Sequence, residues 1–170
     1  LLTKVYIPKY IFPLSKVFSF AVNMLFALIP LYIIPFLKIG HIYWQDVFLP
    51  YDLICLIVFA AGMGLLLSAL TVFFRNMFYI YNVITTAWMY LTPVMYSVTM
   101  IQGHAAWYVK YLVVIMKINP MYQYLTFART VVLAGHTPTL FQFITVAAYA
   151  VVMLVIGGLF FRSKQDKFIY

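Results

Sequence analysis

Residues that could carry out bond-making chemistry are few in this sequence, and they are scattered along it. Among 170 residues there are three His, one Cys and three acidic residues. They form no paired carboxylates, no Ser-His-Asp set and no metal-ligand spacing, and no Gly-rich phosphate loop occurs. Cys55 has no second cysteine to pair with, and we expect His104 and His136 to be solvated loop residues. The sequence therefore predicts no enzyme, no metal site and no cofactor.

Residues that could bind a polar partner gather instead on one face of the stretch 77–101. Their spacing of three, four and seven residues puts them on one side of a helix. They are Tyr81, Asn82, Thr85, Trp88, Met89, Thr92 and Tyr96. Such a face is costly against acyl chains, so it is expected to line a hydrated path or to meet a protein partner. Hydrogen bonding to neighbouring helices, with an aromatic belt at the membrane surface, explains it equally well.

The composition requires a membrane around these residues. Hydrophobic residues make up 66%, aromatic residues 20% and charged residues only 8% of the chain. A soluble domain has about 25% charged residues, which cover its surface. An ordinary soluble enzyme, a disordered tail and a nucleic-acid-binding module are thereby excluded. The net charge of +8 does not indicate nucleic acid, because the basic residues form no stripe and lie between apolar blocks.

Four uncharged stretches reach the ~20 residues needed to cross the hydrocarbon core. They are 17–37, 53–74, 77–101 and 140–161. Pro30 and Pro35 interrupt the first, and Pro93 breaks the third and permits a bend near its outer end. The stretches are too uniformly apolar for the alternating strands of a barrel. The predicted fold is an all-α, polytopic membrane helix bundle with four transmembrane helices, forming a single domain over residues 1–170.

A fifth apolar region, 111–134, is expected to form a helical hairpin on the outer side. Asn119-Pro120 divides it into two pieces that are too short to span, and Lys110, Lys117 and Arg129 would be costly in lipid. We interpret it as a re-entrant or interfacial hairpin that returns to its starting side. A fifth full span with a proline kink is the alternative.

The basic residues predict the orientation. With four spans, the side that holds both ends of the chain carries seven Lys and Arg residues and the other side carries four. The positive-inside rule then places both ends in the cytoplasm. In the second span, Ala60, Gly64 and Ser68 lie four apart, with Gly62 and Ala69 nearby, and predict close packing against another helix.

Several motifs, in order and spacing, resemble the type-2 ABC transporter permeases that export cell-surface polysaccharide, O-antigen or teichoic acid. The resemblance covers nearly the whole chain. It is carried by YIPKYIFP at 6–13, GMGLLLSALTVFFR at 62–75, WMYLTPVMY at 88–96, NPMY at 119–122 and QDKF at 165–168. Asn76 departs from the pattern, because the family often has an acidic residue there.

The resemblance implies six spans per subunit, with two permeases and two cytoplasmic ATP-binding subunits in the transporter. The four spans here correspond to the third to sixth, so the chain, which starts at Leu1 rather than Met, is expected to be a fragment that lacks an amphipathic helix and two spans. The loop with Tyr6, Ile7, Pro8 and Lys9 is expected to dock on the ATP-binding subunit, although a plain basic loop beside the membrane explains it too.

Function follows from the resemblance as a hypothesis. The chain is expected to be a transport subunit of the bacterial cell membrane that forms a homodimer and contacts membrane lipid and a glycan or lipid-linked polymer. The substrate path is assigned to Tyr81, Thr85, Trp88, Thr92 and Tyr96, and an outer gate to Asn119 and Pro120. The alternatives are a type-2 ABC permease for a drug or lipid, a secondary carrier or channel without an ATPase, and a structural membrane scaffold.

Overall fold

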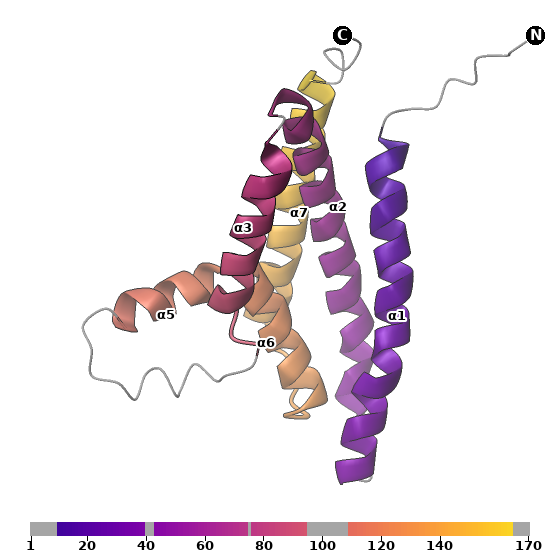
Figure 1. The fold of residues 1–170 in the computed structure, drawn as a ribbon. Helices are drawn as coiled ribbons and strands as arrows, with labels where there is room; N and C mark the ends of the chain where they lie inside the picture. Colours follow the sequence, from indigo (N-terminus) through magenta and orange to yellow (C-terminus); the bar gives the residue numbers. More distant parts are fainter. Residues whose placement is uncertain (1–9, 40–42, 75, 95–108, 165–170) are drawn as a thin grey trace, which may run out of the picture.

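The computed structural model describes residues 10–39, 43–74, 76–94 and 109–164, and these residues contain helices and no strand. Figure 1 shows their arrangement. The elements are α1 (Ile11–Ile39), the short 3₁₀ helix η1 (Trp44–Phe48), α2 (Leu49–Phe73), α3 (Met77–Leu91), α5 (Val109–Ile118), α6 (Pro120–Val132) and α7 (Leu140–Lys164). The all-α prediction is confirmed.

Among the described residues, three helical segments are long and apolar enough to cross a membrane: Ile11–Ile33, Trp44–Thr71 and Leu140–Ser163. They match the first, second and fourth predicted spans. The first continues through Pro30 and Pro35 as one helix to Ile39, so these prolines do not interrupt it. Membrane helices tolerate proline because neighbouring groups satisfy the freed carbonyls.

The third predicted span is described only in part. Its helix, α3, has 15 residues and ends at Leu91, and at 1.5 Å per residue it is too short to cross a ~30 Å core. Thr92 is extended, with φ −87° and ψ 118°, as expected for a residue that precedes proline. The count of four spans is therefore not confirmed, and residues 95–101 of this span lie outside the described residues.

The fifth apolar region forms two short helices that break at Asn119, as the hairpin interpretation predicts. Helix α5 has 10 residues and α6 has 13. Pro120 occupies the first position of α6, where its missing N–H costs nothing. Helix α6 runs beside α2 and α7, whereas α5 projects sideways away from the bundle (Figure 1).

Helices α2 and α7 form the closest pair because glycines let their backbones touch. A Cβ built at Gly62 would lie 2.5 Å from the Met153 carbonyl group, and one at Gly157 would collide with the Gly62 carbonyl oxygen. On α2, the side that contacts α7 is not the predicted face of Ala60, Gly64 and Ser68 but a neighbouring one that contains Gly62. Gly62 and Ala69 are buried, whereas Gly64 faces Val17 of α1 and Ala60 is exposed.

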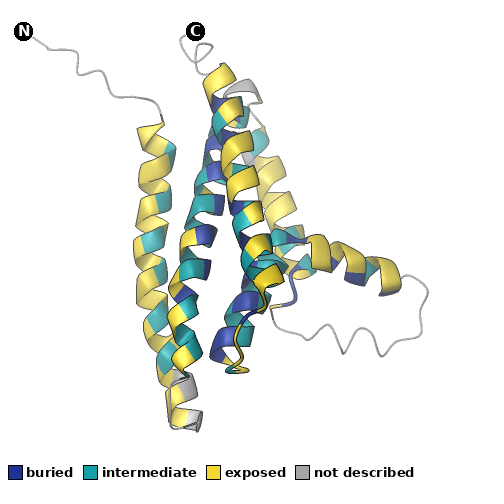
Figure 2. Ribbon diagram, turned by 180° about the vertical axis from the view of Figure 1, so that it is seen from behind, coloured by how far each residue is buried: buried dark blue, intermediate teal, exposed yellow. Residues whose placement is uncertain are grey.

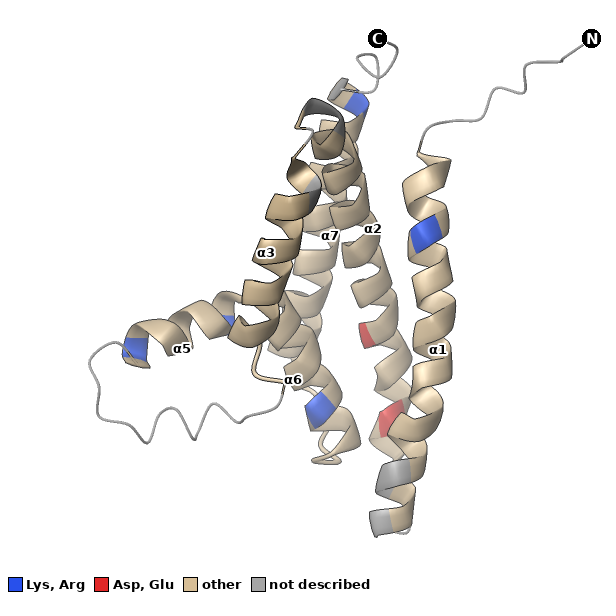
Figure 3. Cartoon of the chain, viewed as in Figure 1, with Lys and Arg blue, Asp and Glu red and all other residues tan. Residues whose placement is uncertain are grey.

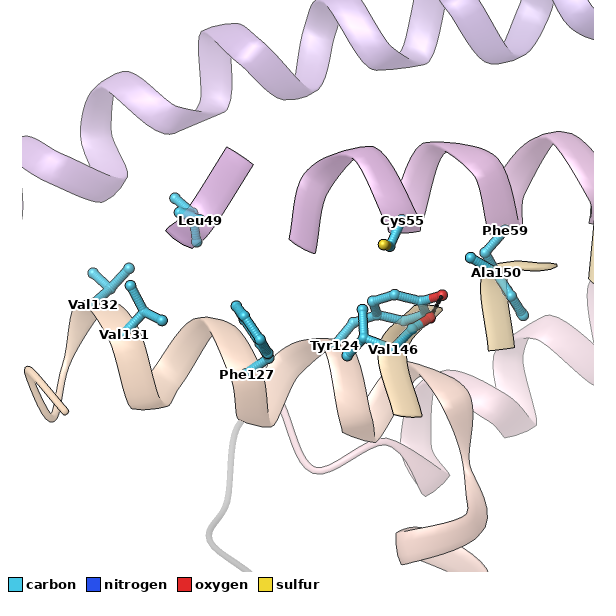
Figure 4. Packing of buried hydrophobic residues seen from close by; sticks show 9 residues of the cluster. All are labelled: Leu49, Cys55, Phe59, Tyr124, Phe127, Val131, Val132, Val146 and Ala150. Atoms are coloured by element: carbon cyan, nitrogen blue, oxygen red, sulfur yellow. Dashed lines mark hydrogen bonds between the residues drawn. The ribbon is translucent and has the colours of Figure 1, made fainter. Parts of the chain in front are cut away.

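The core lies between α2, α6 and α7 (Figure 4). Phe127 of α6 has no exposed surface and meets the Phe143 ring edge-on, with 5.0 Å between ring centroids. Two tyrosines connect the helices through carbonyls of α7, since the Tyr51 hydroxyl donates to Phe143 at 3.0 Å and the Tyr124 hydroxyl to Val146 at 3.1 Å. Helix α6 is thus fixed to the long helices by aromatic packing and by hydrogen bonds.

Helices α1 and α3 lie at the edges of this core. Figure 2 shows exposed residues over most of α1, whose half-buried residues form one stripe toward α2. The stripe contains Pro13, Val17, Ala21, Met24, Leu28 and Tyr32. Helix α3 is exposed from Tyr79 to Ala87 and becomes buried only at Thr92 and Pro93, just after its end. Its attachment to the bundle is therefore concentrated at one point.

The start of α1, the turn between α2 and α3 and the end of α7 lie together at one end of the bundle (Figure 1). This arrangement agrees with the shared side predicted for both ends of the chain. The acidic residues of the described part lie toward the opposite end, on η1 and α2 (Figure 3). Charge is thus absent from the middle of the long helices.

Candidate functional site

The candidate site lies where α3 ends against the break between α5 and α6, and Asn119 is at its centre. The Trp88 indole Nε1 donates to Asn119 Oδ1 at 2.8 Å, and Asn119 Nδ2 donates to Thr92 Oγ1 at 2.9 Å. Asn119 Oδ1 also accepts the Met121 backbone N–H at 3.0 Å and so caps α6. One buried amide therefore starts α6 and holds α3.

Arg129 makes a second connection between the hairpin and the end of α3. Its Nη2 donates to the Pro93 carbonyl at 2.9 Å and to the Val94 carbonyl at 2.8 Å. These carbonyls follow the end of α3 and have no helical partner. In lipid, an unpaired backbone carbonyl would cost several kcal/mol, so a charged donor at this position stabilises the break.

The carbonyls at the end of α5 also receive side-chain donors. Gln123 Nε2 donates to the Lys117 carbonyl at 2.5 Å, and the Tyr149 hydroxyl of α7 donates to the Ile118 carbonyl at 2.8 Å. Non-helical backbone within a membrane protein persists where the protein satisfies it. The two chain breaks are therefore built parts of the fold, with partners supplied by α6 and α7.

We call this contact the joint. It comprises the side chains of Trp88, Thr92, Asn119 and Arg129 and the carbonyls of Pro93 and Val94. Thr92 is 7% exposed and Asn119 is 6% exposed, so water does not compete freely for their hydrogen bonds. Arg129 forms no ion pair with a carboxylate in the described part of the chain. The joint is thus a set of directional hydrogen bonds between the end of α3 and the hairpin.

A shallow groove of about 560 Å³ opens beside the joint, between α3 and the hairpin. Its lining is almost wholly apolar and consists of Ile84, Ala87, Trp88, Leu91, Ile115, Ile118, Asn119 and Pro120. The polar atoms of Trp88 and Asn119 are engaged with each other. The groove therefore presents hydrocarbon and ring surface to whatever enters it.

Two carboxyl groups lie near the other end of α6. Asp52, in the first turn of α2, is 3% exposed, and its Oδ1 has no hydrogen-bond partner among the described residues. The positive end of the helix dipole favours an acid at that position. Asp46 Oδ1 in η1 is likewise buried without a partner there. Among the described residues, neither carboxyl group hydrogen-bonds to the joint, and no metal-binding cluster occurs there.

The structure brings together two residues of the predicted path, Trp88 and Thr92, and the predicted gate residue Asn119. Tyr81 and Thr85 lie on the same face of α3, one to three turns earlier, and are exposed. Tyr96 and the predicted docking residues Tyr6, Ile7, Pro8 and Lys9 lie outside the described residues.

Arg129, Gln123 and Tyr149 are the residues of this region that sequence reasoning missed. In the sequence, Arg129 stands out only as a basic residue that would be costly in lipid, and Pro93 only as a helix break. A basic residue and a helix break in the same membrane region are a signal from which a contact between Arg129 and the chain at Pro93 could have been predicted. No signal in the sequence pointed to Tyr149, because it lies 31 residues from Ile118.

No family model matches the chain. The chain is similar to the O-antigen export system permease protein RfbA of Myxococcus xanthus, with 27% identity over 169 residues. The aligned region covers 99% of this chain and 63% of the relative, so the chain spans less than two thirds of that protein's length. This similarity confirms the resemblance to polysaccharide export permeases that the motifs indicate.

Proposed function

Proceeding from this similarity, we propose that the chain is the membrane-spanning permease subunit of an ATP-driven exporter. Its cargo is a cell-surface polysaccharide or polyol-phosphate polymer of the O-antigen, capsule or teichoic acid type. The observation that carries the proposal is the similarity to an O-antigen export permease along 99% of the chain. The all-helical bundle supports it, because no charged residue lies in the middle of the described long helices, where a proton relay would be expected, and this is compatible with energy supplied by another subunit.

The polymer path follows the exposed face of α3. Tyr81 and Thr85 stand on this face above the joint, and Tyr96 would continue it beyond. Aromatic rings offer flat surfaces to the C–H faces of sugars, and hydroxyl groups offer weak, exchangeable hydrogen bonds. Conduction requires sites that bind weakly and release, and an uncharged wall meets this requirement for a long polymer.

The joint is the outer gate of this path. Asn119 and Pro120 mark the break of the hairpin, and the hydrogen bonds to Trp88 and Thr92 hold α3 against it in the closed state. Tilting of α3 driven by the partner subunit would break these bonds and move the hairpin away. The buried state of Asn119 makes the change discrete, because a half-open amide would lose its bonds without gaining water.

The proposed transporter contains two copies of this chain and two cytoplasmic ATP-binding subunits. Tyr6, Ile7, Pro8 and Lys9 would form the docking loop, because a short basic and aromatic segment between prolines is too polar to span. Both ends of the chain would lie in the cytoplasm of a bacterial cell, with the joint toward the outer leaflet of the cell membrane.

The experiment is polymer export into inside-out membrane vesicles that contain the permease and its ATP-binding partner. We expect export that depends on ATP, and we expect Tyr81→Ala to lower it several-fold at unchanged protein level. Tyr90→Ala is the matched control. Tyr90 lies nine residues further along α3, about two and a half turns, and so on the opposite side of the helix.

Three outcomes contradict the proposal or a part of it. Transport driven by an ion gradient without a nucleotide-hydrolysing subunit would make the chain a secondary carrier. ATP-dependent transport of a small drug or lipid, with no movement of polymer, would keep the architecture and overturn the cargo. Equal effects of the Tyr81 and Tyr90 substitutions would remove the α3 face from the path.

A further inference from the structure

Within the joint, the hydrogen bonds of Arg129 differ from those of Asn119, because they go to the backbone that follows α3. We propose that Arg129 is a positioning residue, which fixes the chain after α3 so that Trp88 and Thr92 meet Asn119. This inference rests on the proposed function in one respect only, namely that the joint is a gate. The positional claim itself concerns the geometry of the joint.

The argument starts from the number of attachment points. Asn119, the N-cap residue of α6, holds α3 through the side chains of Trp88 and Thr92. A single point of attachment leaves the end of α3 free to pivot. Arg129 lies ten residues further along α6 and holds the next two residues of the α3 segment, Pro93 and Val94, by their carbonyls. Two points on one rigid helix fix the direction of the segment as well as its position.

The chemistry of the second attachment suits a positioning role. The Arg129 guanidinium finds its acceptors in two successive carbonyls at a proline break. Charged donors make shorter and stronger hydrogen bonds than neutral ones. Because Pro93 is fully buried whereas Val94 is 51% exposed, the Pro93 carbonyl cannot turn to water when the donor is removed, and the Val94 carbonyl can. Loss of Arg129 should therefore release the segment, and the change should be felt at Trp88.

The Trp88 indole N–H reports this directly. In a protein that carries Trp44→Phe and Trp107→Phe, Trp88 is the remaining tryptophan, and its indole N–H can be followed by hydrogen exchange in nuclear magnetic resonance. We expect Arg129→Met to speed this exchange about tenfold, the factor that ~1.4 kcal/mol of lost hydrogen bonding gives. Arg129→Lys retains a charged donor and should restore most of the protection.

Lys117→Met is the matched control, since it removes the same charge from the same hairpin at an exposed side chain. It should leave the exchange of the Trp88 N–H unchanged. If Arg129→Met fails to give a monodisperse protein, Arg129→Gln replaces it, because Gln keeps an NH₂ donor and removes the charge. Unchanged protection of Trp88 in a folded Arg129→Met or Arg129→Gln protein overturns the inference. Equal loss of protection in the Lys117 control overturns it as well.

Export by the same variants separates this inference from the proposed function. Faster exchange together with altered export supports both. Faster exchange with normal export supports the positioning role of Arg129 and contradicts the assignment of the joint as a gate. Altered export with unchanged exchange leaves the gate standing and overturns the positioning role.

Discussion

Asn119 makes three of the four hydrogen bonds that an amide side chain can make, two of them to the end of α3 and one to the start of α6. It accepts from Trp88 and Met121 and donates to Thr92. The carboxamide holds its two acceptor lone pairs and its NH₂ donors on separate atoms, so it can reach all three partners at once without carrying a charge. A single residue therefore defines both the start of α6 and the position of α3.

Asn119→Ala should destabilise the folded protein by about 2–4 kcal/mol, from a lost helix cap of ~1 kcal/mol and two lost bonds of ~1 kcal/mol each. The indole N–H of Trp88 would also lose its acceptor. Thermal unfolding in detergent measures the effect. Asn82→Ala on the exposed face of α3 is the control, and an equal loss of stability in both variants would contradict the central role of Asn119.

The sequence identified most residues of the joint, but it did not predict that they contact one another. The Asn119-Pro120 pair stood out as a helix break, and Trp88 and Thr92 stood out by their helical spacing. Their contact joins residues 27 and 31 positions apart, and no local pattern encodes such a pairing. Arg129 was misjudged because its partners are backbone carbonyls, which any residue carries.

Helices α2 and α7 pack against each other, and the hairpin helix α6 packs on both of them. Gly157 lies against the Gly62 carbonyl, whereas a Cβ at Gly158 would meet no atom within 4 Å. The two neighbouring glycines therefore differ in what they allow. Small residues at a helix crossing give close backbone approach, and packing then replaces the hydrophobic driving force that lipid removes.

Gly157→Ala should lower stability by about 1–3 kcal/mol, since the added methyl group must push the helices apart. Gly158→Ala should be neutral or slightly stabilising, because alanine favours the helix by up to ~1 kcal/mol. Thermal unfolding of the two variants in the same detergent distinguishes them. Similar melting temperatures would show that the helices are not in contact at Gly157.

The long helices followed from apolar length, and the end of α3 followed from Pro93. The faces of the helices were less predictable. Helix α2 is apolar or small on every side, so its sequence did not indicate which glycine would meet α7 and which would meet α1. The stripe through Gly64 was predicted to pack closely, and the structure places Gly62 at the crossing instead. Packing partners decide such a choice, and they lie elsewhere in the chain.

Over the whole molecule, the two ends of the bundle should lie on opposite sides of the membrane. Asn76, in the turn before α3, and His136, in the segment before α7, are exposed at these two ends. Cys55 is the single cysteine and is buried. We expect Asn76→Cys to react with an impermeant maleimide only from the cytoplasmic side and His136→Cys only from outside. Labelling of both from one side would contradict the orientation.

The membrane class and the helical architecture were predictable because composition alone excludes a charged surface. The arrangement of helices was not, since α1 and α3 present most of their surface away from the core. Their sequences contain little that specifies a neighbour within this chain. The core of α2, α6 and α7 is the part where apolar spacing and contact agree, as at Tyr124 and Val132.

The exposed sides of α1 have a consequence for how this protein can change over generations. None of the most apolar window within Ile11–Ile33 is buried against the described residues, so exchanges among leucine, isoleucine, valine and phenylalanine there disturb little of the described core. The few residues that bind at the break between α5 and α6 have no such freedom. Among related sequences, α1 should therefore diverge fastest, and Trp88, Asn119 and Arg129 should be the most conserved.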